Sequence, residues 1–160
     1  MPGARILLVE DDEVLCELIL RNLEIRGHEV HAAADAQAAL AHLRTAPFDL
    51  IILDICLPDQ TGWHVLRTAQ KEGKLSPLEM NGHAGQLPVV VLSAVRVSPG
   101  HLQEFHPLAY LPKPFPMEAI LRLAAEAASR RNGEAVSEKE DEEESADSHI
   151  TLPYEEDLYA

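Results

Sequence analysis

Polar and charged side chains stand where four short apolar runs of this sequence end. They are Glu10, Asp11, Asp54, Ser93 and Lys113. Carboxylate oxygens are hard ligands, and a few of them together with several waters suit Mg²⁺. A carboxylate beside such a metal is a potential nucleophile toward phosphorus, because the metal and an ammonium group can neutralise the charge of a phosphoryl group in transfer.

Asp54 is the least expected of these residues. It closes DLIILD at 49–54, a run of branched apolar residues that is typical of a strand buried on both faces. An ionised carboxylate is almost never fully buried unless it is paired or binds a metal. The acids at 10–13 have a second interpretation, as residues favoured by the dipole at a helix start, and we assign Asp12 to helix capping. That interpretation leaves Asp54 unexplained.

Five apolar runs alternate with five helical patterns and would position these side chains. The expected strands cover 5–9, 28–33, a run ending at Asp54, 87–94 and 109–112, and the expected helices cover 12–27, 36–44, 62–73, a short 98–107 and 114–131. This alternation predicts an α/β fold with a parallel sheet wrapped on both sides. In such sheets, ligands bind beyond the carboxyl ends of the strands, which is where the polar residues stand.

Several local features support the predicted helices. Asp35 and Ser98 are placed as N-caps, and Gly27 as a C-terminal cap. Two apolar helix faces are expected, made by Leu15, Leu18, Ile19 and Leu23 and by Met117, Ile120, Leu121 and Ala124. We expect Cys16 and Cys56 to be free thiols that serve as small core residues.

Composition divides the chain into a folded domain and an acidic C-terminal segment. The 160 residues are 46% hydrophobic, which is enough for one domain with a real core, assigned to 1–130. The segment 131–160 holds 11 of the 27 acidic residues and two of the 13 Lys and Arg, which is typical of a solvated tail. We expect a cytoplasmic protein without membrane insertion, and the net charge of −14 argues against direct nucleic-acid binding.

The end of the acidic segment has two interpretations. It carries apolar residues at Ile150, Leu152, Tyr154, Leu158 and Tyr159. They are either a short docking motif for a partner or for the folded domain, or chance members of a solvated tail.

Four motifs in order resemble the receiver domain of two-component response regulators, over about residues 4–130. They are ILLVEDDE (6–13), DICLPDQTG (54–62), PVVVLSA (88–94) and YLPKPF (110–115). The resemblance implies a doubly wound, flavodoxin-like (βα)5 fold with strand order 2-1-3-4-5. It also implies that Asp54 accepts a phosphoryl group from a histidine kinase or a phosphotransfer protein.

The resemblance further implies a Mg²⁺ site beside Asp54. Asp11 would bind the metal directly, Glu10 largely through water, and Asp54 and the backbone carbonyl of Cys56 would complete the protein ligands. A receiver of this kind is a phosphoacceptor that promotes its own phosphorylation and dephosphorylation, and it is not an enzyme acting on other substrates.

The remaining motif residues would handle the phosphoryl group and the response to it. By resemblance, Ser93 and Lys113 would grip the phosphoryl oxygens, the Lys113–Pro114 bond would be cis, and Tyr110 would be an aromatic switch. Taken alone, Ser93 reads equally well as an ordinary strand-end hydroxyl and Lys113 as a solvated loop charge. For Tyr110 the alternative to a switch is a packed edge aromatic.

The sequence departs from the family pattern in two places. The connection at 73–87 is long, and the stretch from Ser93 to Tyr110 is short and lacks the common Gly before the strand. We expect a stand-alone receiver that signals to an unknown partner by protein contact. The alternatives are a pseudo-receiver that binds without phosphorylation and a haloacid dehalogenase-type phosphatase, which would need an acid where Cys56 stands.

Overall fold

The structure is a computed structural model that describes residues 2–75 and 87–133. Its centre is a parallel sheet of five strands: β1 (Arg5–Val9), β2 (Glu29–Ala33), β3 (Leu50–Asp54), β4 (Val89–Ser93) and β5 (Ala109–Pro112). The helices are α1 (Glu13–Ile25), α2 (Ala36–Thr45), α3 (Gly62–Lys71), α4 (Pro99–Phe105) and α5 (Met117–Arg131). The sheet order is β2-β1-β3-β4-β5, which confirms the predicted fold class and strand order.

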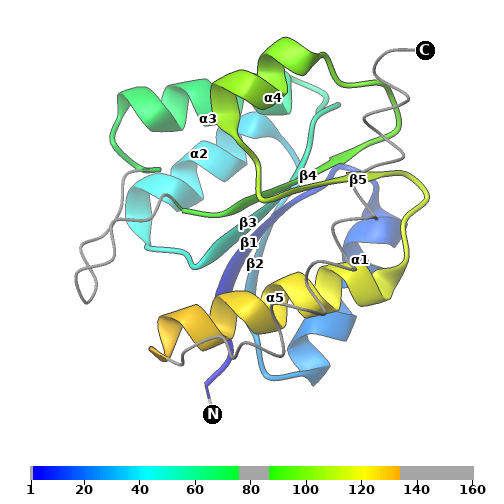
Figure 1. Ribbon diagram of the computed structural model, residues 1–160, viewed down its shortest axis with the longest axis vertical. Coiled ribbons are helices and arrows are strands. Elements are labelled where there is room, and N and C mark those ends of the chain that lie inside the picture. Colours follow the sequence, from blue (N-terminus) through cyan, green and yellow to red (C-terminus); the bar gives the residue numbers. More distant parts are fainter. Residues whose placement is uncertain (1, 76–86, 134–160) are drawn as a thin grey trace.

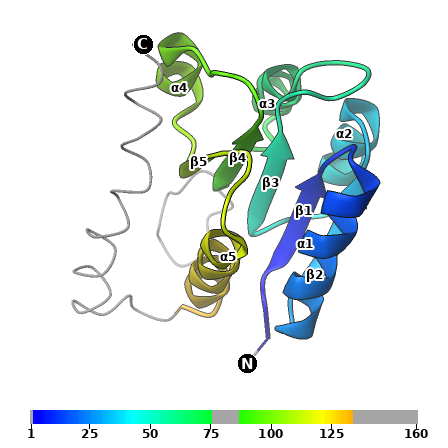
Figure 2. The ribbon, with the colours of Figure 1, turned by 90° about the vertical axis from the view of Figure 1, so that its right-hand side faces the viewer.

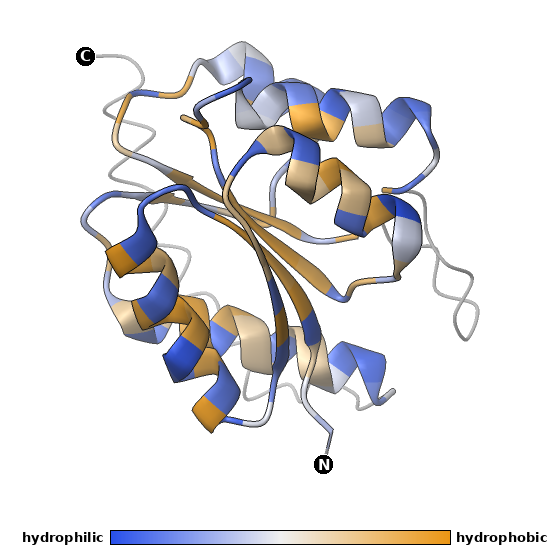
Figure 3. Cartoon of the chain, turned by 180° about the vertical axis from the view of Figure 1, so that it is seen from behind, coloured by the Kyte–Doolittle hydropathy of each residue, from blue (hydrophilic) through white to orange (hydrophobic). Residues whose placement is uncertain are grey.

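Helices cover both faces of the sheet (Figure 1). Side chains alternate along a strand, so that Leu7 and Val9 of β1 belong to the core on the side of α2, α3 and α4, while Ile6 and Leu8 belong to the core on the side of α1 and α5. Figure 2 shows the two helical layers on either side of the twisted sheet. Figure 3 shows the central strands mostly orange and the helices striped in orange and blue, as expected for strands buried on both faces.

The predicted helix caps are present. The carboxylate of Asp12 accepts a hydrogen bond from Leu15 N at 3.1 Å, and Asp35 and Ser98 occupy the N-cap positions of α2 and α4. Gly27 follows α1 with φ +88°, a conformation that favours glycine. The short helix expected at 98–107 is confirmed as α4.

The predicted apolar face of α1 is wrong at Leu18. Ile19 and Leu23 are fully buried, but the Leu18 side chain is 52% exposed. Residues five apart lie about 140° apart around a helix, so Leu18 and Leu23 cannot both face the sheet. The side of α1 that carries Leu18 instead faces solvent.

The expected core placement of the cysteines is wrong for Cys56. Both thiols are free, Cys16 is half-buried against the α1–α5 side of the core, and Cys56 is exposed. Strand β3 ends at Asp54, and Cys56 lies in the turn to α3, where it pairs with Thr61 in an isolated β-bridge. Cys56 therefore borders the end of the sheet and does not lie within it.

Aromatic stacking joins the short helix α4 to α3. The Trp63 ring stacks on His101 and on Phe105, with centroid distances of 4.7 Å and 5.5 Å. An ion pair between Arg67 and Glu104 at 2.9 Å spans the same two helices. These contacts hold α4 although it is only seven residues long.

Two sequence predictions fall mostly outside the described residues. The long connection at 73–87 is described only at its ends, and the acidic segment only as far as Gly133. Helix α5 ends at Arg131, beside the predicted domain boundary, and the division at that point stays a prediction. Within residues 2–75 and 87–133, no helix has the length and apolar character that crossing a bilayer requires.

Candidate functional site

Parallel pairing brings the polar strand ends to one edge of the sheet. Glu10 directly follows β1, Asp54 and Ser93 are the last residues of β3 and β4, and Lys113 directly follows β5. These four strands are adjacent and run in one direction, so their carboxyl ends meet. The chain passes from β1 to β2 on one side and then to β3 on the other side of β1, so the strand order reverses between β1 and β3. Open α/β sheets bind ligands at such a point.

One ammonium group joins two buried carboxylates in this site. Lys113 Nζ donates hydrogen bonds to Glu10 Oε2 at 2.9 Å and to Asp54 Oδ2 at 3.1 Å. The Glu10 and Asp54 side chains are 0% and 4% exposed, whereas that of Lys113 is 20% exposed. The buried Asp54 carboxylate therefore has the partner that its position in an apolar strand requires.

The turn after β3 holds the other oxygen of Asp54. The Cys56 N–H donates to Asp54 Oδ1 at 3.0 Å, and the Gly62 N–H closes the turn by donating to the Ile55 carbonyl at 2.8 Å. A Cβ at Gly62 would lie only 2.7 Å from the Asp54 carbonyl oxygen. The turn can therefore fold this closely only with glycine at position 62.

Three carboxylates converge beside Lys113. One oxygen each from Glu10, Asp11 and Asp54 lie within 4.8 Å of one another, and Asp11 is exposed to solvent. Burial and the nearby charge of Asp54, opposed by the hydrogen bond from Lys113, raise the pKa of Glu10 to about 7. Hard oxygen donors with an excess of negative charge at the solvent edge fit Mg²⁺, which keeps several waters.

Lys113 keeps its charge in this site. Burial alone would lower the pKa of its ammonium group, but the hydrogen bonds to Glu10 and Asp54 outweigh burial and raise that pKa. The ammonium group is therefore a fixed positive charge beside Asp54. The Lys113–Pro114 peptide bond is cis, as expected.

The hydroxyl of Ser93 is bonded within its own loop. Ser93 Oγ donates to the Val95 carbonyl at 2.7 Å and accepts from the Val95 N–H at 3.0 Å. The Tyr110 hydroxyl donates to the same carbonyl at 3.0 Å, and the Tyr110 side chain is buried. The link from Ser93 to Lys113 runs through the backbone, where the Lys113 N–H donates to the Ser93 carbonyl at 2.8 Å.

Sequence reasoning missed the part played by Asp59. Its carboxylate accepts from the N–H groups of Ala36 and Gln37 at 2.9 Å and 3.1 Å, and these bonds lower its pKa. Asp59 thus caps α2 from the turn that carries Cys56, and it fixes that turn to a second element. An acid two residues before the cap of α3 was the available signal, but its partner lies 23 residues away in the sequence.

The chain matches the family model of the response regulator receiver domain over residues 6–125. Regulatory protein VanRB of Enterococcus faecalis is 30% identical over 136 residues, which are 84% of this chain and 56% of that protein. The DNA-binding dual master transcriptional regulator RpaA of Synechocystis is 31% identical over 73% of this chain and 46% of that protein. The chain thus spans about half the length of these curated relatives.

Solved structures agree with the sequence matches. The receiver domain of HemR from Leptospira biflexa is 31% identical with a TM-score of 0.64, and it matches over 81% of this chain and 95% of that one. TrrA from Thermotoga maritima, solved in complex with Mg²⁺ and BeF, shares the fold at 24% identity with a TM-score of 0.62, over 79% of this chain and 99% of that one. With the family model covering residues 6–125, this chain belongs to the response regulator receiver domain family.

Proposed function

We propose that Asp54 is the phosphoacceptor of this receiver, and that its phosphodonor is a histidine kinase or a histidine phosphotransfer protein. The observation that carries the proposal is the buried Asp54 carboxylate at the end of β3, held by Lys113 at 3.1 Å beside Glu10. A structural ion pair would need only one carboxylate. Three carboxylates about one ammonium group instead leave negative charge that a cation and an incoming phosphoryl group would use.

Mg²⁺ is the metal we assign to this site. Asp11, Asp54 and the backbone carbonyl of Cys56 would bind it, and Glu10, which is buried and receives Lys113, would act largely through water. The ion would supply positive charge against the oxygens of a transferring phosphoryl group. Asp59 supports the site by holding the turn that carries Cys56.

The transfer itself is a displacement at phosphorus. One oxygen of Asp54 forms a bond to phosphorus while the bond from phosphorus to the donor imidazole nitrogen breaks, and that nitrogen keeps the electron pair. Lys113 then neutralises an oxygen of the acyl phosphate. Water later attacks phosphorus, the bond from phosphorus to the Asp54 oxygen breaks, and inorganic phosphate leaves while the carboxylate is restored. No other substrate is turned over, so the protein acts as a signalling module.

The response to phosphate starts at Ser93. Its hydroxyl would leave the Val95 backbone and donate to a phosphoryl oxygen of Asp54, and the loop after β4 would move with it. Tyr110 is bonded to the same loop and would change its position in turn. The changed surface at α4 would then bind a downstream protein. The acidic chain gives no basis for direct nucleic-acid contact.

A surface for the phosphodonor lies on α1, beside the site. Val14, Leu18 and Ile25 are 80%, 52% and 81% exposed, and helical geometry places them within about 40° of one another. This stripe of apolar side chains starts three residues after Asp11, extends away from the site, and is interrupted by the exposed Arg21. An apolar helical face of the donor would cover it while the donor histidine reaches Asp54. The cytoplasm, where ATP charges histidine kinases, is the compartment that the proposal requires.

Intact mass after incubation with acetyl phosphate and Mg²⁺ tests the phosphoacceptor. The wild type should gain one phosphate, and Asp54→Asn should gain none. Asp35→Asn is the matched control, because Asn caps α2 as well as Asp does, and it should gain phosphate like the wild type. No gain in any of the three proteins, with the fold intact by circular dichroism, would favour the pseudo-receiver that binds without phosphorylation.

A further inference from the structure

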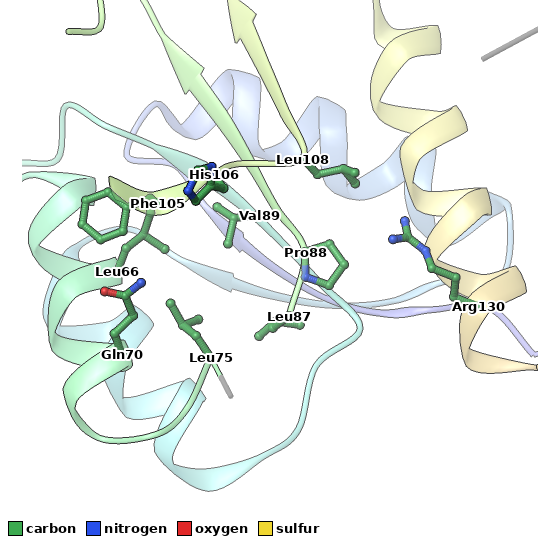
Figure 4. A pocket seen from close by; sticks show the side chains of 10 residues that line it. All are labelled: Leu66, Gln70, Leu75, Leu87, Pro88, Val89, Phe105, His106, Leu108 and Arg130. Carbon is green, nitrogen blue, oxygen red and sulfur yellow. The ribbon is translucent and has the colours of Figure 1, made fainter. Parts of the chain in front are cut away.

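A cavity lies at the end of the sheet opposite to the phosphoacceptor site. It has a volume of about 170 Å³ and is bounded by the starts of β4 and β5, by α3, and by the end of α4. Figure 4 shows apolar side chains around the hollow and Arg130 of α5 pointing toward Pro88 from the far side. The lining includes Leu66, Leu75, Leu87, Val89, Phe105 and Leu108.

The size and chemistry of this cavity fit one aromatic ring. A dry apolar cavity of about 150 Å³ is large enough to bind benzene. Leucine, valine and phenylalanine side chains make most of the wall, and Leu108 is 39% exposed at the edge. The apolar part of this wall favours an apolar group over water, and Gln70, His106 and Arg130 supply the polar part.

The rim of the cavity favours a ring that is followed by negative charge. Arg130 and His106 are the titratable residues among the described side chains that line it, and none of these is acidic. Arg130 Nε donates to the Glu126 carbonyl at 3.4 Å, which leaves its terminal guanidinium nitrogens directed toward the rim in Figure 4. A carboxylate placed there would gain a charge-assisted hydrogen bond.

This chain contains a segment with that chemistry. Residues 150–159 read ITLPYEEDLY, in which Tyr154 is preceded by a stiff proline and followed by Glu155, Glu156 and Asp157. The chain leaves α5 at Gly133, three residues after Arg130 of the rim. Twenty-one residues separate Gly133 from Tyr154, and a chain of this length reaches at most about 70 Å, well beyond the radius of gyration of about 14 Å for such a domain.

We propose that the segment 150–159 binds back onto the receiver, with the Tyr154 ring in this cavity and the following carboxylates at Arg130. The tether gives the segment a local concentration in the millimolar range, so that a contact too weak to form between separate molecules is occupied within one. The bound segment would cover Phe105 and His106 at the end of α4 and so would compete with any partner for that part of the helix. This inference does not depend on phosphorylation.

Photo-crosslinking of the full, unphosphorylated chain tests the contact. Benzoylphenylalanine is introduced by Tyr154→Bpa, the protein is irradiated, and the monomer band is mapped by mass spectrometry. We expect cross-links to peptides that contain residues 87–89 or 105–108. Tyr159→Bpa, at the same residue type five positions along the same segment, is the matched control and should give fewer cross-links to these peptides. Arg130→Glu should lower the Tyr154 yield about two- to fivefold, the range of one exposed ion pair.

A second measurement needs no photo-crosslinker in place of the tyrosine. Leucine methyl signals are compared between the wild type and Tyr154→Ser, and the methyls of Leu66, Leu87 and Leu108 should shift while the remote Leu20 should not. Unchanged methyl signals together with an absence of cavity cross-links would overturn the proposal. Cross-links found only in a dimer band would also overturn it, because the occupant would then come from a second copy. Equal yields from Tyr159 and Tyr154 would overturn the assignment of the ring.

Discussion

The hydroxyl of Tyr110 donates a hydrogen bond to the backbone carbonyl of Val95 across 3.0 Å. The same carbonyl accepts the Ser93 hydroxyl at 2.7 Å, so two residues from neighbouring strands hold the loop after β4 through one oxygen. We therefore expect a change in the hydrogen bond of either hydroxyl to alter the hydrogen bond of the other. This shared acceptor is the physical link that we propose between the phosphoryl group and the α4 surface.

Removing the Tyr110 hydroxyl should loosen this loop. Tyr110→Phe keeps the buried ring but loses the hydrogen bond to the Val95 carbonyl, and the free energy of unfolding in urea should fall by about 1 kcal/mol. Amide exchange should rise in the loop after β4 and should stay unchanged in β1. An equal rise in amide exchange throughout the protein would show that the hydroxyl does not act on this loop in particular.

Removing the Lys113 charge should leave two buried carboxylates without their cation. Lys113→Ala should lower the free energy of unfolding by about 3 kcal/mol in EDTA, as for a broken buried pair. Added Mg²⁺ should recover part of this loss, because it replaces positive charge at the same carboxylates. Lys71→Ala, at an exposed position on α3, should change stability by less than about 0.5 kcal/mol. Equal losses with and without Mg²⁺ would argue against metal binding at these carboxylates.

We expect Cys56 and Val95 to lie beside the path of a water that attacks the acyl phosphate. These two side chains should make the acyl phosphate persist. Cys56 and Val95, two positions past Asp54 and Ser93, offer poor hydrogen bonding to water, and both are exposed. Cys56→Asn adds a group able to orient water and should shorten the lifetime of the phosphorylated protein about tenfold, the rate equivalent of one hydrogen bond. The decay is followed by intact mass after removal of the phosphodonor. Equal lifetimes in the two proteins would refute the idea.

Buried His28 should make stability depend on pH. Its Nδ1 accepts the Ala4 N–H at 3.0 Å, and burial together with the charge of Arg26 lowers the pKa of His28 below its ordinary value of 6.5. The unfolded chain therefore binds a proton more readily, and stability that is complete above pH 6.5 is lost as the pH falls below that value.

The variant His28→Asn isolates this titration. Asparagine offers an acceptor near the position of Nδ1 and does not titrate, so it can retain the bond to Ala4 without the pH dependence. Urea unfolding between pH 7.5 and 5.0 should show a smaller decrease in stability for the variant than for the wild type. Parallel curves for the two proteins would assign the decrease to other groups.

Much of the fold follows from local sequence. The alternation of apolar runs with helical patterns fixed five strands and five helices, and the caps at Asp12, Asp35 and Ser98 were read from residue type and spacing. Local physics suffices there because a cap needs only a side-chain oxygen next to an unpaired N–H. The strand order 2-1-3-4-5 came from the resemblance, since pairing between distant strands has no local signal.

Burial of individual side chains was less predictable. Leu18 and Cys56 are exposed although both residue types are usually buried, because the rotation of α1 against the sheet and the end of β3 at Asp54 decide what they face. Asp59 could not be paired with the start of α2 from sequence, since the two segments meet only after the sheet forms.

The sequence by itself determined which chemical groups stand at the strand ends: the acids after β1, Asp54, Ser93 and Lys113. Only the tertiary structure decided how they combine. Lys113 lies 103 residues from Glu10 in the chain but 2.9 Å away in space, and the Ser93 hydroxyl is directed to Val95 and not to the carboxylates. Residue types are set one at a time, whereas distances, burial and the pKa of Glu10 depend on how four parallel strands align their ends.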